Sequence, residues 1–115
     1  MNLSETMNDG VMVVHVKSPR VDAASAHEFR AAIADVAARG HTRLIVDLSA
    51  VQFIDSTGLG ALVSALKLLG RDGRIVVVGA RESVATLFRV TRMDKVFRMH
   101  LSNTEAIAAL AEGAR

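Results

Sequence analysis

The chain has no cysteine, and this absence removes several kinds of chemistry at once. Without thiols there is no disulfide, no zinc–thiolate site and no thiol nucleophile, and such a composition is typical of proteins in a reducing cytoplasm. Tryptophan and tyrosine are also missing, and there is one proline. Half of the 115 residues are nevertheless apolar. A single domain of this length can therefore bury a hydrophobic core without metal or disulfide crosslinks.

Long apolar runs are also missing. The longest are a few residues, whereas a membrane-spanning helix needs roughly 20. The first ten residues, MNLSETMNDG, lack the basic and apolar segments of a signal peptide. We therefore predict a cytoplasmic protein that does not insert into a membrane.

Charge of neither sign dominates, since 14 Lys and Arg face 12 Asp and Glu, for a formal net charge of +2. Arg89, Arg92, Lys95 and Arg98 make one basic cluster, in which Phe97 is the single aromatic residue. Nucleic-acid surfaces usually combine positive charge with a recognisable fold or with aromatic residues. We interpret the cluster as a solvated face and predict no direct binding of nucleic acid.

The common enzyme motifs are absent as well. There is no phosphate-binding P-loop, and Gly58 and Gly60 are not followed by a third glycine, because position 63 is valine. Ser56 lacks the preceding glycine of a hydrolase nucleophile elbow, since residue 54 is isoleucine. The four histidines show no spacing typical of a metal site. We therefore predict a protein that is not an enzyme and uses no cofactor or metal.

Strand and helix patterns alternate along the chain. Short β-branched runs predict strands, and apolar residues at helical spacing predict helices. Asn8-Asp9-Gly10 is a turn signal that predicts an opening hairpin. Alternating strands and helices favour parallel pairing through right-handed crossovers. The prediction is one α/β domain over 1–115, with a mixed, mostly parallel sheet of four to five strands and about four helices. The strands are expected within 2–7, 10–17, 43–49, 73–79 and 96–101, and the helices within 25–40, 56–70, 82–91 and 102–113.

Residue alternation in two strands predicts how the sheet is covered. Side chains alternate across a sheet, so His15 and Asp47 lie on the face opposite the aliphatic residues of their strands. We therefore expect helices to cover one face thickly and the other only in part, and we interpret Asp47 as structural. The aliphatic residues of the thickly covered face are Met12, Val14, Val16, Leu44, Val46 and Leu48.

Helix boundaries have their own signals. Ser25 with Glu28, and Ser102 with Glu105, fit the capping-box pattern at two helix starts. Gly40 stands where a helix usually ends in a glycine. The third helix is expected to turn Val84, Leu87 and Val90 inward.

The segment VQFIDSTGLG, residues 51–60, interrupts an aliphatic stretch with an acid, two hydroxyls and two glycines. In one interpretation Ser56 only caps the next helix by accepting a backbone N–H. In the other, the start of this helix is a ligand or modification site, because free N–H groups there favour an anion. Gly58 and Gly60 lower helix propensity, which indicates that something approaches closely. A phosphoryl group on Ser56 would fit the second interpretation.

The segment LIVDLSAVQFIDSTGLGALVSALK resembles the central part of STAS domains, and in particular the bacterial anti-sigma-factor antagonists. The match includes a strand with Asp47, then Asp-Ser-Thr-Gly-Leu-Gly over 55–60. Val21-Asp22 corresponds to a Leu/Val-Asp pair before the first helix of that family, although the family usually has a glycine before that Asp, where this chain reads Ser18-Pro19-Arg20. The later strand and short helix, 75–97, extend the resemblance over nearly the whole chain.

The resemblance implies a superhelix of βα units and a role in partner switching. The unphosphorylated protein would bind a kinase-type anti-sigma factor and release the sigma factor. Phosphorylation of Ser56 would abolish binding, and a PP2C-type phosphatase would restore it. The residues implied to bind the partner are Asp22, Asp55, Ser56, Thr57, Gly58, Leu59 and Gly60.

Several roles stay open on the sequence. Asp22 either lines the partner site or only ends its loop, and Thr57 is either a second acceptor or a neutral neighbour. Arg89 and Arg92 either border the interface or are solvated. The alternative function is a STAS domain that is never phosphorylated and serves as a docking subunit, for example in an ABC-type lipid transport complex.

Overall fold

The computed structural model, which describes residues 1–113, begins with the predicted hairpin. Strands β1 (Leu3–Asn8) and β2 (Val11–Val16) pair in antiparallel register. Asp9 and Gly10 join them with φ angles of 51° and 79°. Two successive positive φ angles are what a tight hairpin turn requires, and Asp-Gly is a preferred pair there. The turn signal read from the sequence is confirmed.

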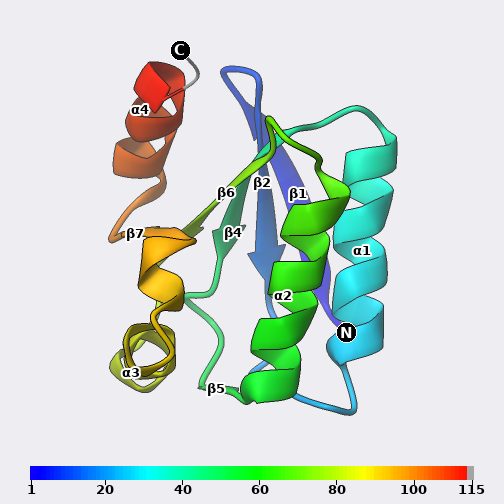
Figure 1. Ribbon diagram of the computed structural model, residues 1–115, viewed down its shortest axis with the longest axis vertical. Coiled ribbons are helices and arrows are strands. Elements are labelled where there is room, and N and C mark those ends of the chain that lie inside the picture. Colours follow the sequence, from blue (N-terminus) through cyan, green and yellow to red (C-terminus); the bar gives the residue numbers. More distant parts are fainter. Residues whose placement is uncertain (114–115) are drawn as a thin grey trace.

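The main sheet has five strands in the order β1-β2-β4-β6-β7 (Figure 1). Strands β4 (Arg43–Asp47), β6 (Arg74–Val78) and β7 (Arg98–His100) run parallel to β2 and to one another. Crossover helices connect the parallel strands, as βα units require. The α/β fold with a mostly parallel sheet is therefore confirmed.

The four helices lie on the two faces of this sheet. Helices α1 (Ala26–Ala38) and α2 (Ser56–Leu68) lie side by side on one face, whereas α4 (Asn103–Gly113) covers the other (Figure 1). Helix α3 (Glu82–Val90) adds its buried side chains to the core of the first face. A short 3-10 helix, η1 (Met93–Lys95), follows α3 and was not predicted.

Two hydrophobic clusters separate along the sheet faces. The larger contains Val14, Val46 and the inner faces of α1, α2 and α3. The smaller contains Val13, Ile45 and Val76, with Ala106 and Leu110 from α4. The predicted unequal covering of the two faces is confirmed.

A second, two-stranded sheet was not predicted. Strand β3 (Arg20–Val21) pairs in parallel with β5 (Phe53–Ile54), although β3 follows Pro19 directly and proline usually interrupts strand pairing. Pro19 still takes part, because its carbonyl accepts hydrogen bonds from the Gln52 and Phe53 amides. This small sheet ties the segment before α1 to the segment before α2.

Two details of the helices differ from the expectation. Val90 is 73% exposed and Phe88 is fully buried, so the inward face of α3 passes through Phe88 in its last turn. Ser25 stands at the N-cap of α1 but makes no capping hydrogen bond, and its hydroxyl accepts from the Asp22 amide. Glu28 binds the terminal amine of Met1 at 2.7 Å, so the first capping box is wrong.

The other two helix-boundary signals agree better with the structure. Gly40 follows Arg39, the C-cap residue of α1, with a φ of 94°, the conformation in which glycine ends helices. At α4, the Ser102 hydroxyl accepts from the Glu105 amide. The Glu105 carboxylate accepts in return from Leu101, one residue before the partner of an ideal box.

Candidate functional site at the start of helix α2

The candidate site lies at the carboxyl end of the parallel strands. Figure 1 shows β5 and the start of α2 at the end toward which β2 and β4 point. The Asp55 amide donates to the Val21 carbonyl at 3.2 Å and continues the β3–β5 pairing up to the helix. The start of α3 also holds this segment, because Arg81 and Ser83 donate to the carbonyls of Ser49 and Gln52. The site is therefore supported on both sides.

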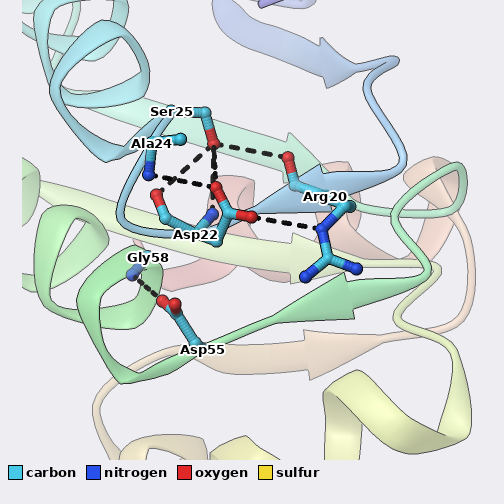
Figure 2. Close-up of polar contacts among 6 residues, drawn as sticks. All are labelled: Arg20, Asp22, Ala24, Ser25, Asp55 and Gly58. Atoms are coloured by element: carbon cyan, nitrogen blue, oxygen red, sulfur yellow. Dashed lines mark hydrogen bonds and ion pairs between the residues drawn. The ribbon is translucent and has the colours of Figure 1, made fainter.

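Asp55, and not Ser56, caps α2. The backbone of Asp55 is extended, and its Oδ1 accepts from the Gly58 amide at 2.9 Å (Figure 2). A carboxylate in this position satisfies one of the free N–H groups at the helix start. The interpretation of Ser56 as the capping residue is wrong, and Ser56 is the first residue of the helix.

Ser56 and Thr57 are both exposed. Within residues 1–113 the Ser56 hydroxyl has no hydrogen-bond partner. Asp55, and not Ser56, provides the cap of the helix. The hydroxyl is therefore accessible and is not needed to hold the helix.

Gly58 and Gly60 differ in the atoms that a side chain at each position would meet. A Cβ on Gly58 would lie 2.3 Å from the carbonyl oxygen of Val21, a distance at which atoms overlap. A Cβ on Gly60 would meet nothing within 4 Å, and Gly60 is exposed. The close approach inferred from the sequence is thus internal at Gly58, where β3 packs against α2. At Gly60 the chain itself supplies no reason for a glycine.

Asp22 follows β3 and is held in place by three groups. Its carboxylate accepts from Arg20 Nε at 3.1 Å, from the Ala24 amide at 3.1 Å and from the Ser25 hydroxyl (Figure 2). The hydrogen bond from Arg20 is the main reason that the pKa of Asp22 lies below its ordinary value, although desolvation opposes it. The side chain is 22% exposed, so Asp22 both shapes its loop and stays within reach of solvent.

Arg20 and Phe53 lie opposite each other in the β3–β5 pairing. The Arg20 guanidinium lies 4.3 Å from the centre of the Phe53 ring, in a cation–π arrangement. Phe53 is 40% exposed, which is unusual for a phenylalanine two residues from a helix cap. The pair adds an apolar, positively charged element beside the start of α2.

The family model of the STAS domain matches residues 3–108. The chain belongs to the STAS domain family. RsfB, an anti-sigma-F factor antagonist of Mycobacterium tuberculosis, is 28% identical over 92% of this chain and 86% of its own length. The anti-sigma-B factor antagonist of Staphylococcus aureus is 27% identical over 89% of this chain and 93% of its own length.

A solved structure agrees with both. The crystal structure of an anti-sigma factor antagonist from Mycobacterium paratuberculosis has a TM-score of 0.87 and 30% identity, and the match covers 96% of this STAS domain and 93% of that chain. The resemblance read from the sequence is confirmed at the level of the family and the fold.

The site residues predicted for this STAS domain do not all reach its surface. Asp55, Ser56, Thr57 and Gly60 are accessible at the start of α2. Gly58 and Leu59 are buried, so they support this surface from below. Asp22 lies at the end of β3, next to the strand that leads into Asp55.

Sequence reasoning missed the Arg20–Phe53 pair. The available signal was a repeated pattern, since an apolar residue and an aspartate precede the first two helices at Val21-Asp22 and Ile54-Asp55. Two equivalent segments before neighbouring parallel helices are placed to pair with each other.

Asp47 belongs to a different part of this STAS domain. On the face covered by α4, its Oδ2 lies 2.9 Å from His15 Nδ1, and its Oδ1 accepts from the Ser49 amide at 2.9 Å. Burial acts to raise the pKa of Asp47, but the hydrogen bonds from Ser49 and His15 outweigh it and the pKa is lowered. These contacts support its interpretation as a structural residue.

Other kinds of site have no support in residues 1–113. No helix there is both long and apolar enough to cross a membrane. In the same part of the chain, no three metal-binding side chains come together.

Proposed function

We propose that this protein is an anti-sigma factor antagonist whose binding is switched off by phosphorylation of Ser56. The observation that carries the proposal is the exposed Ser56 hydroxyl, which lies in the first turn of α2 and has no internal partner in residues 1–113. The relatives named as anti-sigma factor antagonists support the role. The partner is a kinase-type anti-sigma factor, which uses its own ATP, and a PP2C-type phosphatase removes the phosphate.

The surface offered to the partner is small and preformed. It consists of Ser56, Thr57 and the bare turn at Gly60, with Phe53 beside them. Gly60 lets another backbone approach the helix, and Phe53 offers apolar area of the kind that anchors interfaces. In this role the protein is a substrate and a binding module in the cytoplasm, and not an enzyme.

Electrostatics account for release without a change of fold. A phosphate adds about −1.5 to −2 charges, and a helix N-terminus stabilises a negative group by only about 0.3–1 kcal/mol at an exposed site. At a packed interface the same charge loses its water, which costs several kcal/mol unless a cation pairs with it. The carboxylate of Asp55 is the adjacent side chain and adds repulsion. The phosphorylated surface therefore favours solvent over the partner.

The test uses the cognate anti-sigma factor. Ser56→Ala is expected to bind it whether or not ATP is present, and Ser56→Asp to bind at least tenfold more weakly. Incubation of the wild-type protein with the anti-sigma factor and ATP should add one phosphate, which mass spectrometry maps to Ser56. Ser102→Asp is the matched control, because it also replaces a serine at the start of a helix by a charged residue, and it should leave binding unchanged.

Two results would contradict the proposal. One is a phosphate that maps outside residues 55–57. The other is equal binding by Ser56→Ala and Ser56→Asp, which is the behaviour of a docking subunit that is never phosphorylated.

A further inference from the structure

Three arginines lie at the amino ends of three neighbouring parallel strands. Arg43 and Arg74 are direct partners in the pairing of β4 with β6, and Arg98 is opposite Val76 in the pairing of β6 with β7. Because side chains alternate along a strand, Arg74 and Val76 share a face. Arg43, Arg74 and Arg98 therefore all lie on the face that α4 covers.

This arrangement is unfavourable for the isolated protein. Like charges directly opposite each other in a sheet destabilise it, and none of the three guanidinium groups has an ion pair or hydrogen bond within residues 1–113. Arg39 shows the contrast, since it binds Glu5 and Asp35. The positive charge at the amino ends of the strands is thus not balanced by the described side chains.

The three arginines border a groove of about 950 Å³. Arg71, from the loop before β6, and Lys95, from η1, also line it. Asp72 is the only carboxylate among the described lining residues, against five permanent cations. The apolar lining includes Val76 and Leu110, which belong to the smaller hydrophobic cluster under α4.

The groove divides the basic cluster that the sequence suggested. Lys95 and Arg98 line the groove, but Arg89 and Arg92 do not. Arg89 lies on α3 and donates to the Thr86 hydroxyl. The other cations of the groove come from segments far from this cluster in the sequence, and only the strand register brings them together.

We propose that this groove binds a small anion that carries two or more phosphate groups. Guanidinium groups bind phosphate oxygens through paired hydrogen bonds, and a row of them matches a chain of phosphates. The volume is that of a small-molecule site. His100 is the only aromatic side chain among the described lining residues, so the groove offers few rings on which successive nucleobases could stack, and a single nucleic-acid strand is disfavoured.

The groove is separate from the site at Ser56. Figure 1 places α4 and the amino ends of β4 and β6 at the end of the molecule opposite β5 and the start of α2. An anion bound there leaves the surface of Ser56 and Gly60 free. The proposed anion site can therefore be tested independently of the proposed partner switch.

The first test is calorimetric titration of the full chain with inorganic tripolyphosphate at constant ionic strength. Arg74→Gln is expected to weaken binding about tenfold or more, because it removes one charge-assisted contact. Arg89→Gln, an exposed arginine outside the groove, is the matched control and should bind as the wild type does. Orthophosphate, with a single phosphate, should bind more weakly than tripolyphosphate.

A second measurement separates a binding role from a structural one. Without the anion, Arg74→Gln should melt at a higher temperature than the wild type, because repulsion with Arg43 is relieved. With tripolyphosphate, its melting temperature should rise less than that of the wild type. A merely structural arginine would instead give a variant that is less stable under both conditions.

Three outcomes would overturn the proposal. The first is an effect of tripolyphosphate no larger than that of sodium chloride at equal ionic strength, and the second is equally tight binding of tripolyphosphate by Arg74→Gln and the wild type. Tighter binding of an oligonucleotide with the same number of phosphates would assign the groove to nucleic acid instead.

Discussion

Along β4, the carboxyl end carries Asp47, whose carboxylate is hydrogen-bonded to His15 and to the Ser49 amide, whereas the amino end carries Arg43, whose guanidinium has no hydrogen bond or ion pair in residues 1–113. Both residues lie on the face of α4. At the carboxyl end Arg20 also pairs with Asp22, and Asp55 caps α2. At the amino end Arg43 faces Arg74.

The two ends of the sheet therefore offer two different kinds of site for an anion. The carboxyl end satisfies its own charges and leaves a neutral hydroxyl exposed, so a negative charge there is added and removed by chemistry. The amino end holds permanent positive charge that folding alone does not neutralise. Substitutions that disturb the packing of the first end should therefore affect stability more than those that remove charge from the second.

The largest effect is expected from Gly58→Ala. The added Cβ would overlap the Val21 carbonyl, and overpacking of this kind outweighs the gain in helix propensity, for a net loss of about 2 kcal/mol. The free energy of unfolding from urea denaturation measures it. Unchanged stability would mean that α2 can move away from β3, and the tight packing of the carboxyl end would be refuted.

Gly60→Ala is the matched control in the same helix, with an effect of opposite sign. Because the new methyl group meets no atom within 4 Å, the variant should be more stable by about 1 kcal/mol. It should also bind the anti-sigma factor more weakly, because the methyl group obstructs the bare turn. A variant that gains stability and keeps full affinity would remove Gly60 from the proposed interface.

The smallest effect concerns Asp47 and pH. Its pKa in the folded protein is lowered from the ordinary 3.8, so the stability it contributes is fully present above that value and is lost as the pH falls through the lowered pKa. Urea denaturation at pH 5 and at pH 3 should show a greater loss for the wild type than for Asp47→Asn. Equal losses would mean that the hydrogen bonds from Ser49 and His15 do not stabilise the charged form of Asp47.

Much of this architecture could be predicted because it depends on local pattern. Alternation placed His15 and Asp47 on one face, and the Asp-Gly signal located the hairpin turn. The position of Ser56 at a helix start was also predictable to within one residue. The choice of cap between Asp55 and Ser56 was not, because both are good capping residues and the β3–β5 pairing decides between them.

What the sequence does not contain is long-range register. Strands of two residues, such as β3 and β5, are too short to show a period. The pairing of Arg43 with Arg74 depends on the length and packing of the intervening crossover, which no local pattern encodes. No local pattern encodes the contact of Gly58 with Val21 either. From the sequence alone, Gly58 therefore indicated the close approach of a ligand.

The pairing of β3 with β5 has a consequence for any enzyme that modifies Ser56. Many kinases read an extended peptide, but here the residues before Ser56 are fixed between Val21 on one side and the start of α3 on the other. An enzyme that reaches this hydroxyl must accept the folded shape as its substrate. A short synthetic peptide with the same sequence around Ser56 would lack that shape and should be a much poorer substrate than the whole domain.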